Sequence, residues 1–186
     1  KGIESWANLS FMQTQEDILD DKYIINYNSD GEQIIKGYTL NNIIVSSDTI
    51  YPGFIPRPTD QRISFSLYFQ DYLPNDPTIK MHLGIFFGSG LPFGPPNTEK
   101  HKHILRMPSY RRVDLGISKQ LISEAGYNQT FLKSIKNAWI SIEVLNLLQV
   151  NNTISYIWIA DVTGRMYAIP NYLTPRQLNV KMMIQF

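Results

Sequence analysis

The clearest chemistry in this sequence comes from isolated charges that alternate with apolar residues. In RRVDLGIS, Arg112 and Asp114 lie two residues apart, so a β-strand would place both side chains on one face. A guanidinium can bind the carboxylate or phosphate of a ligand, or it can form an internal ion pair, which is the favoured interpretation here. Lys80, His82 and Glu143 occupy polar positions of similar segments. Together these five side chains are the predicted ligand-binding set.

Three other motifs resemble known site patterns, but each lacks an essential part. HKH at 101–103 offers two imidazoles without further ligands at a metal-binding spacing. NYNSDGE at 26–32 begins like a calcium loop, but Gly37 stands where such a loop needs a bidentate Glu. Acidic residues at 16–21 keep a weak calcium site as the alternative. GSGLPFG at 88–94 lacks the Lys and Ser or Thr of a phosphate-binding loop. The favoured prediction is therefore no metal and no cofactor.

The composition excludes several classes of protein. The 186 residues contain no Cys, which excludes a disulfide scaffold, a Cys-based zinc site and a thiol nucleophile. The net charge is +1 without runs of like charge, so we expect no nucleic-acid partner. No apolar run approaches the roughly eighteen residues of a membrane helix. No nucleophile elbow or paired carboxylates can be identified, and we predict that the chain is not an enzyme.

The elements that must carry these side chains are strands, because polar and apolar residues alternate along most of the chain. One example is ISFSLYF at 63–69, where every second residue is apolar. Helical spacing is found only in SEAGYNQTFLKSIK at 123–136, as a weak candidate. The predicted strands lie near 2–14, 62–72, 78–90, 109–122, 137–160 and 166–186. The long connections 15–61 and 88–109 are expected to be functional, because structureless loops of this length are unusual in compact domains.

Alternation alone is compatible with two all-β folds. In a soluble β-sandwich the apolar face packs inward, whereas in an outer-membrane barrel it meets lipid and the polar face lines the lumen. The polar positions are mostly Ser, Gly, Gln, Asn and Tyr, and charged residues are only 18% of the chain. Short and long connections alternate, as they do in membrane barrels. Aromatic residues near segment ends are typical of interfacial girdles: Trp6, Tyr72, Tyr110, Trp139, Tyr156, Trp158 and Tyr172. These features favour the antiparallel transmembrane barrel.

Several sequence motifs, taken together and in order, resemble the C-terminal barrel of TonB-dependent outer-membrane receptors of the Bacteroidetes type. They are GIESWANLSFMQTQED, IPRPTDQR, SFSLYFQDY, GSGLPFGPP, MPSYRRVDLGIS, IEVLNLL and YAIPNYLTPRQLNVKMMIQF. The resemblance covers essentially the whole chain. It implies a barrel of about 22 strands with an N-terminal plug, of which this chain would be the last six strands. The function implied is uptake of a scarce ligand, with energy relayed by the inner-membrane TonB complex.

The resemblance also implies where the chain works and with what. The expected location is the cell outer membrane, with 15–61, 88–109 and the hairpin around DVTGRMY outside the cell and the turns at 73–78 and 123–136 in the periplasm. Expected partners are outer-membrane lipid, the rest of the barrel and its plug, and the TonB complex through the missing N-terminal part. Barrel-assembly machinery and a surface lipoprotein are further expected partners. Two alternatives stay open: a barrel fragment held as a client by such partners, and a soluble β-sandwich binding module.

The terminal stretch RQLNVKMMIQF ends on an aromatic residue after a row of alternating apolar positions. In the family that the chain resembles, such a strand is the signal read by the assembly machinery. The resemblance therefore assigns this role to Val180, Met182, Ile184 and Phe186. The opening residues KGIESWANLS have neither an initiator Met nor the pattern of a signal peptide. We accordingly expect the chain to begin within a longer protein and to finish at that protein's own C-terminus.

Overall fold

The computed structural model describes the chain except for residues 1–2, 97–99, 101–104, 124–134 and 174. Its fourteen strands are joined by turns and extended segments, and the described residues include no α-helix. None of the described segments is therefore a helix long and apolar enough to cross a membrane. The prediction of an all-β chain is confirmed.

Six long strands form one antiparallel sheet, as the alternation predicted, in the order β1-β6-β7-β10-β11-β14. Neighbouring strands are also consecutive among the long strands of the chain, so the sheet is a simple meander. The strands are β1 (Glu4–Phe11), β6 (Ile63–Leu73), β7 (Asp76–Gly88), β10 (Tyr110–Ile122), β11 (Asn137–Leu145) and β14 (Gln177–Gln185).

The register keeps apolar residues on one face of all six strands. Leu115 pairs with Leu83 on one side and Val144 on the other. One step along the same face, Ile142 pairs with Ile117 and Val180. Because the side-chain period of a strand is two, the polar residues between them all reach the opposite face. The sheet thus has one polar face and one apolar face, which is mostly aliphatic with some phenylalanines and which we call the aliphatic face.

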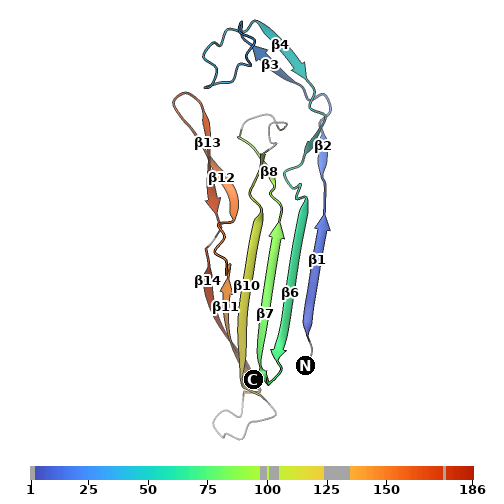
Figure 1. Cartoon of the computed structure of the whole chain (residues 1–186), viewed down its shortest axis with the longest axis vertical. Helices are drawn as coiled ribbons and strands as arrows, with labels where there is room; N and C mark the ends of the chain where they lie inside the picture. The colour runs from blue at the N-terminus through green and yellow to red at the C-terminus, as the bar shows by residue number, and fades with distance from the viewer. Residues whose placement is uncertain (1–2, 97–99, 101–104, 124–134, 174) are drawn as a thin grey trace.

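The aliphatic face has no cover among the described residues. Only Ile55 and Ala138 are buried hydrophobic residues in the described part of the chain. Leu9, Val180 and Met182 are 57%, 60% and 59% exposed. Figure 1 shows the six long strands as a single layer, with no described element lying across it. The described residues form a wall with one apolar and one polar surface, and they include no central core.

The described parts of three long connections, 12–62, 89–109 and 146–176, lie beyond one end of the sheet, and the start of β1 and the end of β14 lie at the other end (Figure 1). The tight β6–β7 turn is at the end that carries the termini. At the opposite end, which we call the rim, four short ladders extend beyond the sheet: β2 (Gln15–Asp17) with β5 (Phe54–Pro56), β3 (Tyr23–Tyr27) with β4 (Ser46–Ile50), β8 (Pro92–Phe93) with β9 (Leu105–Arg106), and β12 (Thr153–Ala160) with β13 (Met166–Tyr172).

The structure differs from the predicted strand ranges at two places. The range 137–160 was predicted as one strand, but a turn at 146–152 separates β11 from β12, and Asn146 and Gln149 adopt φ of 53° and 52° there. Likewise, 166–186 holds both β13 and β14. The connection 15–61 is not a plain loop, since two short ladders run through it. Strands of three to five residues are too short to show a period. The weak helix candidate at 123–136 lies largely outside the described residues.

Candidate functional site

A row of polar side chains crosses the polar face of the sheet from edge to edge. The register aligns Glu4 with Gln70, Gln70 with His82, and His82 with Gly116. Gly116 in turn aligns with Glu143, which aligns with Asn179 on the last strand. We call these residues the transverse row: Glu4, Gln70, His82, Gly116, Glu143 and Asn179. It contains two of the five predicted ligand contacts, His82 and Glu143.

Hydrogen bonds link the members of the transverse row near both edges of the sheet. Gln70 Nε2 donates to Glu4 Oε2 at 3.0 Å and Gln70 Oε1 accepts from the Tyr68 hydroxyl at 2.9 Å. At the other edge, Asn179 Nδ2 donates to Glu143 Oε2 at 3.2 Å. These bonds hold most of the row's acceptors and donors in fixed positions before any ligand arrives.

The centre of the row depends on the absence of a side chain at Gly116. His82 Nε2 and Glu143 Oε1 approach to 3.7 Å across this glycine. A Cβ at Gly116 would lie 2.2 Å from His82 Cε1 and 3.0 Å from Glu143 Cγ. Both side chains would have to move, so Gly116 is what allows the imidazole and the carboxylate to meet. The rings of Trp6 and Tyr68, and of Tyr68 and His82, stack beside this contact with centroids 6.1 and 6.2 Å apart.

Arg112 and Asp114 form the internal ion pair that the sequence favoured. Arg112 Nη2 lies 2.7 Å from Asp114 Oδ2, and Arg112 Nε donates to Asp114 Oδ1 at 2.7 Å. The same Oδ1 accepts from the Asn146 backbone N–H at 2.9 Å. Asp114 is buried, and the Arg112 guanidinium lies 5.8 Å from the centroid of Phe86. The carboxylate therefore joins β10 to the turn that ends β11.

Asn146 and Asn152 complete this hydrogen-bond network, and neither residue was predicted from the sequence. Asn146 exchanges two hydrogen bonds with Val150, and Asn152 exchanges two with the backbone of Arg111 at 2.8 and 2.9 Å. A signal was present: Asn follows an apolar strand end and tolerates φ above zero. These bonds join SYRRVDLG to LNLL, because Asp114 accepts from the Asn146 N–H and the Val113 oxygen accepts from the Leu147 N–H. The adjoining pocket of about 80 Å³ is small for an organic ligand.

The structure brings all five predicted ligand contacts to the polar face. Lys80 is two residues from His82 on β7, and its Nζ lies 5.0 Å from the centroid of the Trp139 ring. Arg112 and Asp114 satisfy each other, whereas His82 and Glu143 meet at the longer distance given above. Although it is ion-paired, the Arg112 side chain is 35% exposed, against 17% for His82 and 24% for Glu143. Ligand contact by these side chains stays a prediction.

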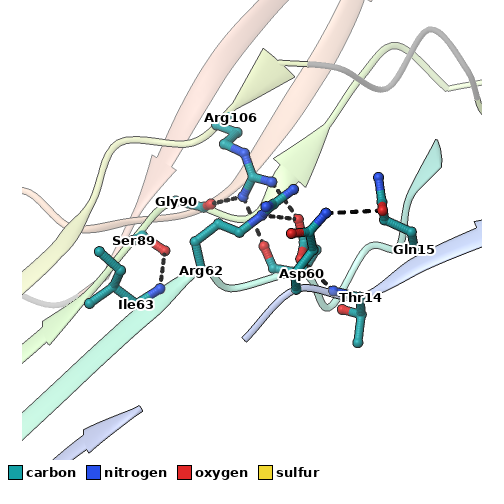
Figure 2. Close-up of polar contacts among 9 residues, drawn as sticks. Thr14, Gln15, Asp60, Arg62, Ile63, Ser89, Gly90 and Arg106 are labelled. Atoms are coloured by element: carbon teal, nitrogen blue, oxygen red, sulfur yellow. Dashed lines mark hydrogen bonds and ion pairs between the residues drawn. The ribbon is translucent and has the colours of Figure 1, made fainter. Parts of the chain in front are cut away.

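A second polar cluster, at the rim, was not found from the sequence. Asp60 is fully buried, and its Oδ1 accepts from the Thr14 backbone N–H at 2.7 Å. Its Oδ2 is paired with Arg62 Nε at 2.7 Å and with the Arg106 guanidinium. Arg106 also donates to the backbone oxygens of Asp60 and Gly90 (Figure 2). We call this cluster the rim clasp; it joins the segments that follow β1, precede β6, follow β7 and include β9.

The rim clasp predicts loss of rim structure in acid. Burial alone would raise the pKa of Asp60, but the Thr14 amide, Arg106 and Arg62 outweigh it and lower the pKa from 3.8 to about 2. A lowered native pKa means that the stabilisation is complete above the unfolded value of 3.8 and is lost as pH falls through about 2. We expect protease sensitivity of 15–61 in the folded protein to rise between about pH 4 and pH 2. Asp60→Asn should remove this step, and an unchanged step would contradict the assignment.

The remaining motifs contribute no metal site in the described part of the chain. HKH at 101–103 lies outside the described residues. Asn28 Oδ1 accepts from the backbone N–H groups of Asp30 and Glu32, so NYNSDGE forms a side-chain-stabilised turn. Within the described ranges, no group of three or more His, Cys, Asp or Glu could hold a metal ion. The stretch GSGLPFG leads from β7 into the short strand β8.

The residues predicted as an assembly signal lie along the last strand and at its end. Val180, Met182 and Ile184 are on the aliphatic face of β14, paired with Ile142, Ile140 and Ala138. Phe186 follows the strand and is 72% exposed.

Comparisons with known proteins found no match, so a functional assignment must be based on the geometry described above. No family model, no curated protein and no solved structure matches the chain.

Proposed function

We propose that this chain forms wall and outer loops of a TonB-dependent outer-membrane transporter that takes up a scarce ligand, as the C-terminal part of a barrel of about 22 strands. The observation that carries the proposal is the continuous aliphatic face on a single-layer sheet. That face is exposed, and the opposite face is held by internal hydrogen bonds and ion pairs.

Hydrogen bonds and ion pairs are found on the polar face, and this supports a lipid environment for the aliphatic face. A soluble sandwich needs a second layer to cover its apolar face, and no described element provides one. Hydrocarbon can cover it instead, because Leu, Ile, Val and Met cost nothing when they face lipid. On the other face the transverse row and the Arg112–Asp114 pair resemble the crowded polar wall of a barrel lumen.

The open edges and the one-sided connections support a larger closed barrel. Among the described residues, nothing pairs with the outer edge of β1 or of β14. A membrane does not tolerate unpaired backbone groups, so both edges need further strands. The described parts of three long connections, 12–62, 89–109 and 146–176, gather at the rim, as the outer loops of membrane barrels do. In this proposal the chain is passive: energy reaches the barrel through the plug and the TonB complex.

The decisive experiment asks where the full-length protein resides and whether it behaves as a barrel. We expect it in the outer-membrane fraction, extracted only with detergent, with gel mobility that changes on heating because closed barrels resist unfolding by detergent at room temperature. Protease added to intact cells should cleave within 15–61 before any cleavage at the β6–β7 turn. A soluble protein without heat-dependent mobility would refute the proposal. An outer-membrane protein cleaved first at the β6–β7 turn would refute the orientation alone.

A further inference from the structure

The strap that crosses the rim is the most unusual feature outside the transverse row. The strap is residues 34–42, between β3 and β4, and it reaches the tip of the β12–β13 hairpin at residues 161–165 (Figure 1). These segments are far apart in sequence, and Arg165 Nε donates to the Gly37 backbone oxygen. The Arg165 guanidinium also lies 4.8 Å from the centroid of the Tyr38 ring. A single arginine thus holds the strap to the hairpin.

The strap backbone at Gly37 lies so close to the hairpin tip that the contact requires a glycine at this position. Gly37 has φ of +81°, and a Cβ there would lie 2.8 Å from the Thr163 backbone oxygen. Any other residue at 37 would be strained by its backbone angle and would push the strap away from the hairpin tip. The strap and the hairpin tip line an open groove of about 660 Å³. This volume lies within the range of about 300–1,000 Å³ that ligand sites occupy.

The groove is basic and contains no carboxylate among its lining residues. Lys36 and Arg165 both line it. Neither of these two cations has an ion pair within the described part of the chain. Several other cations do pair with carboxylates: Arg57, Arg62, Arg106, Arg112 and Lys119. Two unpaired cations around one groove attract an anion and can bind its oxygens directly.

The nearest acidic side chain on the hairpin is already committed to the turn. Asp161 Oδ1 accepts from the backbone N–H groups of Thr163 and Arg165 and from the Thr163 hydroxyl. The Thr163 hydroxyl in particular lowers the pKa of Asp161. This carboxylate therefore stays charged and weakens the basic field near Arg165, whose charge also helps to lower its pKa. Its Oδ1 is bonded within the turn, and its Oδ2 lies 3.5 Å from the Tyr167 hydroxyl. Ile34, Tyr38 and Leu40 add apolar surface to the groove.

We infer that the strap groove binds an acidic organic solute at the outer mouth of the barrel, with Lys36 and Arg165 contacting its carboxylates. The Nε of Arg165 donates to the Gly37 oxygen of the strap. Its Nη atoms have no hydrogen-bond partner among the described residues, so they are the donors that would contact the ligand. Tyr38 and Leu40 contact the organic body. This inference deepens the proposed function and rests on it for the outer location of the rim.

The test uses the full-length protein in detergent, with citrate as the probe, in isothermal titration calorimetry at low ionic strength. We expect citrate to bind, and raising salt to about 0.5 M to weaken binding, because screening acts on exposed charges. Lys36→Gln and Arg165→Gln should each weaken citrate binding by about tenfold or more. Lys22→Gln removes an exposed lysine of the same connection outside the groove, and it should change binding by less than about twofold.

The outcomes separate this inference from the proposed function. Heat-modifiable protein that does not bind citrate, or that binds it equally well in the Lys36 and Arg165 variants, would overturn the groove as a site while leaving the barrel intact. Binding of inorganic phosphate with equal strength would refute the organic acid and identify a simple oxyanion site, as on a lipid headgroup. Retention of citrate binding by a protein found to be soluble would refute the proposed function and keep the site.

Discussion

Replacing Leu67 by arginine should destabilise the folded protein in a bilayer by about 2–4 kcal/mol, which is the cost of a cation facing lipid near the middle of a membrane barrel. Leu67 lies on the aliphatic face in the middle of β6, between Ala7 and Ile85. In the proposed barrel, an arginine there must carry its guanidinium into hydrocarbon or bend it toward the headgroups. The measurement is equilibrium urea unfolding of the full-length protein from lipid vesicles.

The matched control is the adjacent residue. Ser66 occupies the polar face of the same strand, between Asn8 and Phe86, so Ser66→Arg should stay in a hydrated lumen and cost much less. Equal losses for the two variants would argue against a one-sided lipid environment. A greater loss for Ser66→Arg would place the polar face inside the folded structure's dry interior and reverse the proposed orientation.

The six strands of the main sheet could be predicted because each repeats the same two-residue period over eight to thirteen residues. One face of each strand is almost uninterrupted, as in ISFSLYF and MHLGIFF. A one-residue slip would move every apolar side chain to the wrong face, so pattern and register determine each other. The same reasoning placed His82 and Glu143 on one face. It did not predict that they meet, because this depends on the glycine at 116 in the strand between them.

The contacts at the rim could not be predicted in this way. Asp60 meets Arg106 across 46 residues, and Arg165 meets Gly37 across 128 residues. Local periodicity carries no information on such pairs, since nothing near Asp60 in sequence distinguishes Arg106 from any other arginine. The turn at 146–152 was missed for a different reason. Its apolar residues continue the alternating pattern of the strand. Only Asn146 and Asn152 indicate that the backbone turns.

The chain's last residue leads to the second large effect. Phe186→Ala should lower the amount of assembled protein several-fold, because a small loss of free energy during assembly is amplified by degradation of unassembled chains. Phe186 follows β14, whose apolar residues Val180 and Met182 are 60% and 59% exposed. The reading of this strand by assembly machinery is a prediction from the family resemblance.

Phe11 provides the matched control for this prediction. It lies at the end of β1, on the opposite edge of the sheet, and is 72% exposed, the same fraction as Phe186. If burial of an aromatic in lipid were the only factor, Phe11→Ala and Phe186→Ala would lower abundance equally. A signal at the C-terminus predicts a selective loss for Phe186→Ala, measured as the heat-modifiable band in outer membranes. Protein that does assemble should bind its ligand with unchanged affinity, because Phe186 lies at the end of the sheet opposite the rim. Unchanged abundance of the Phe186 variant would show that the terminal aromatic carries no signal.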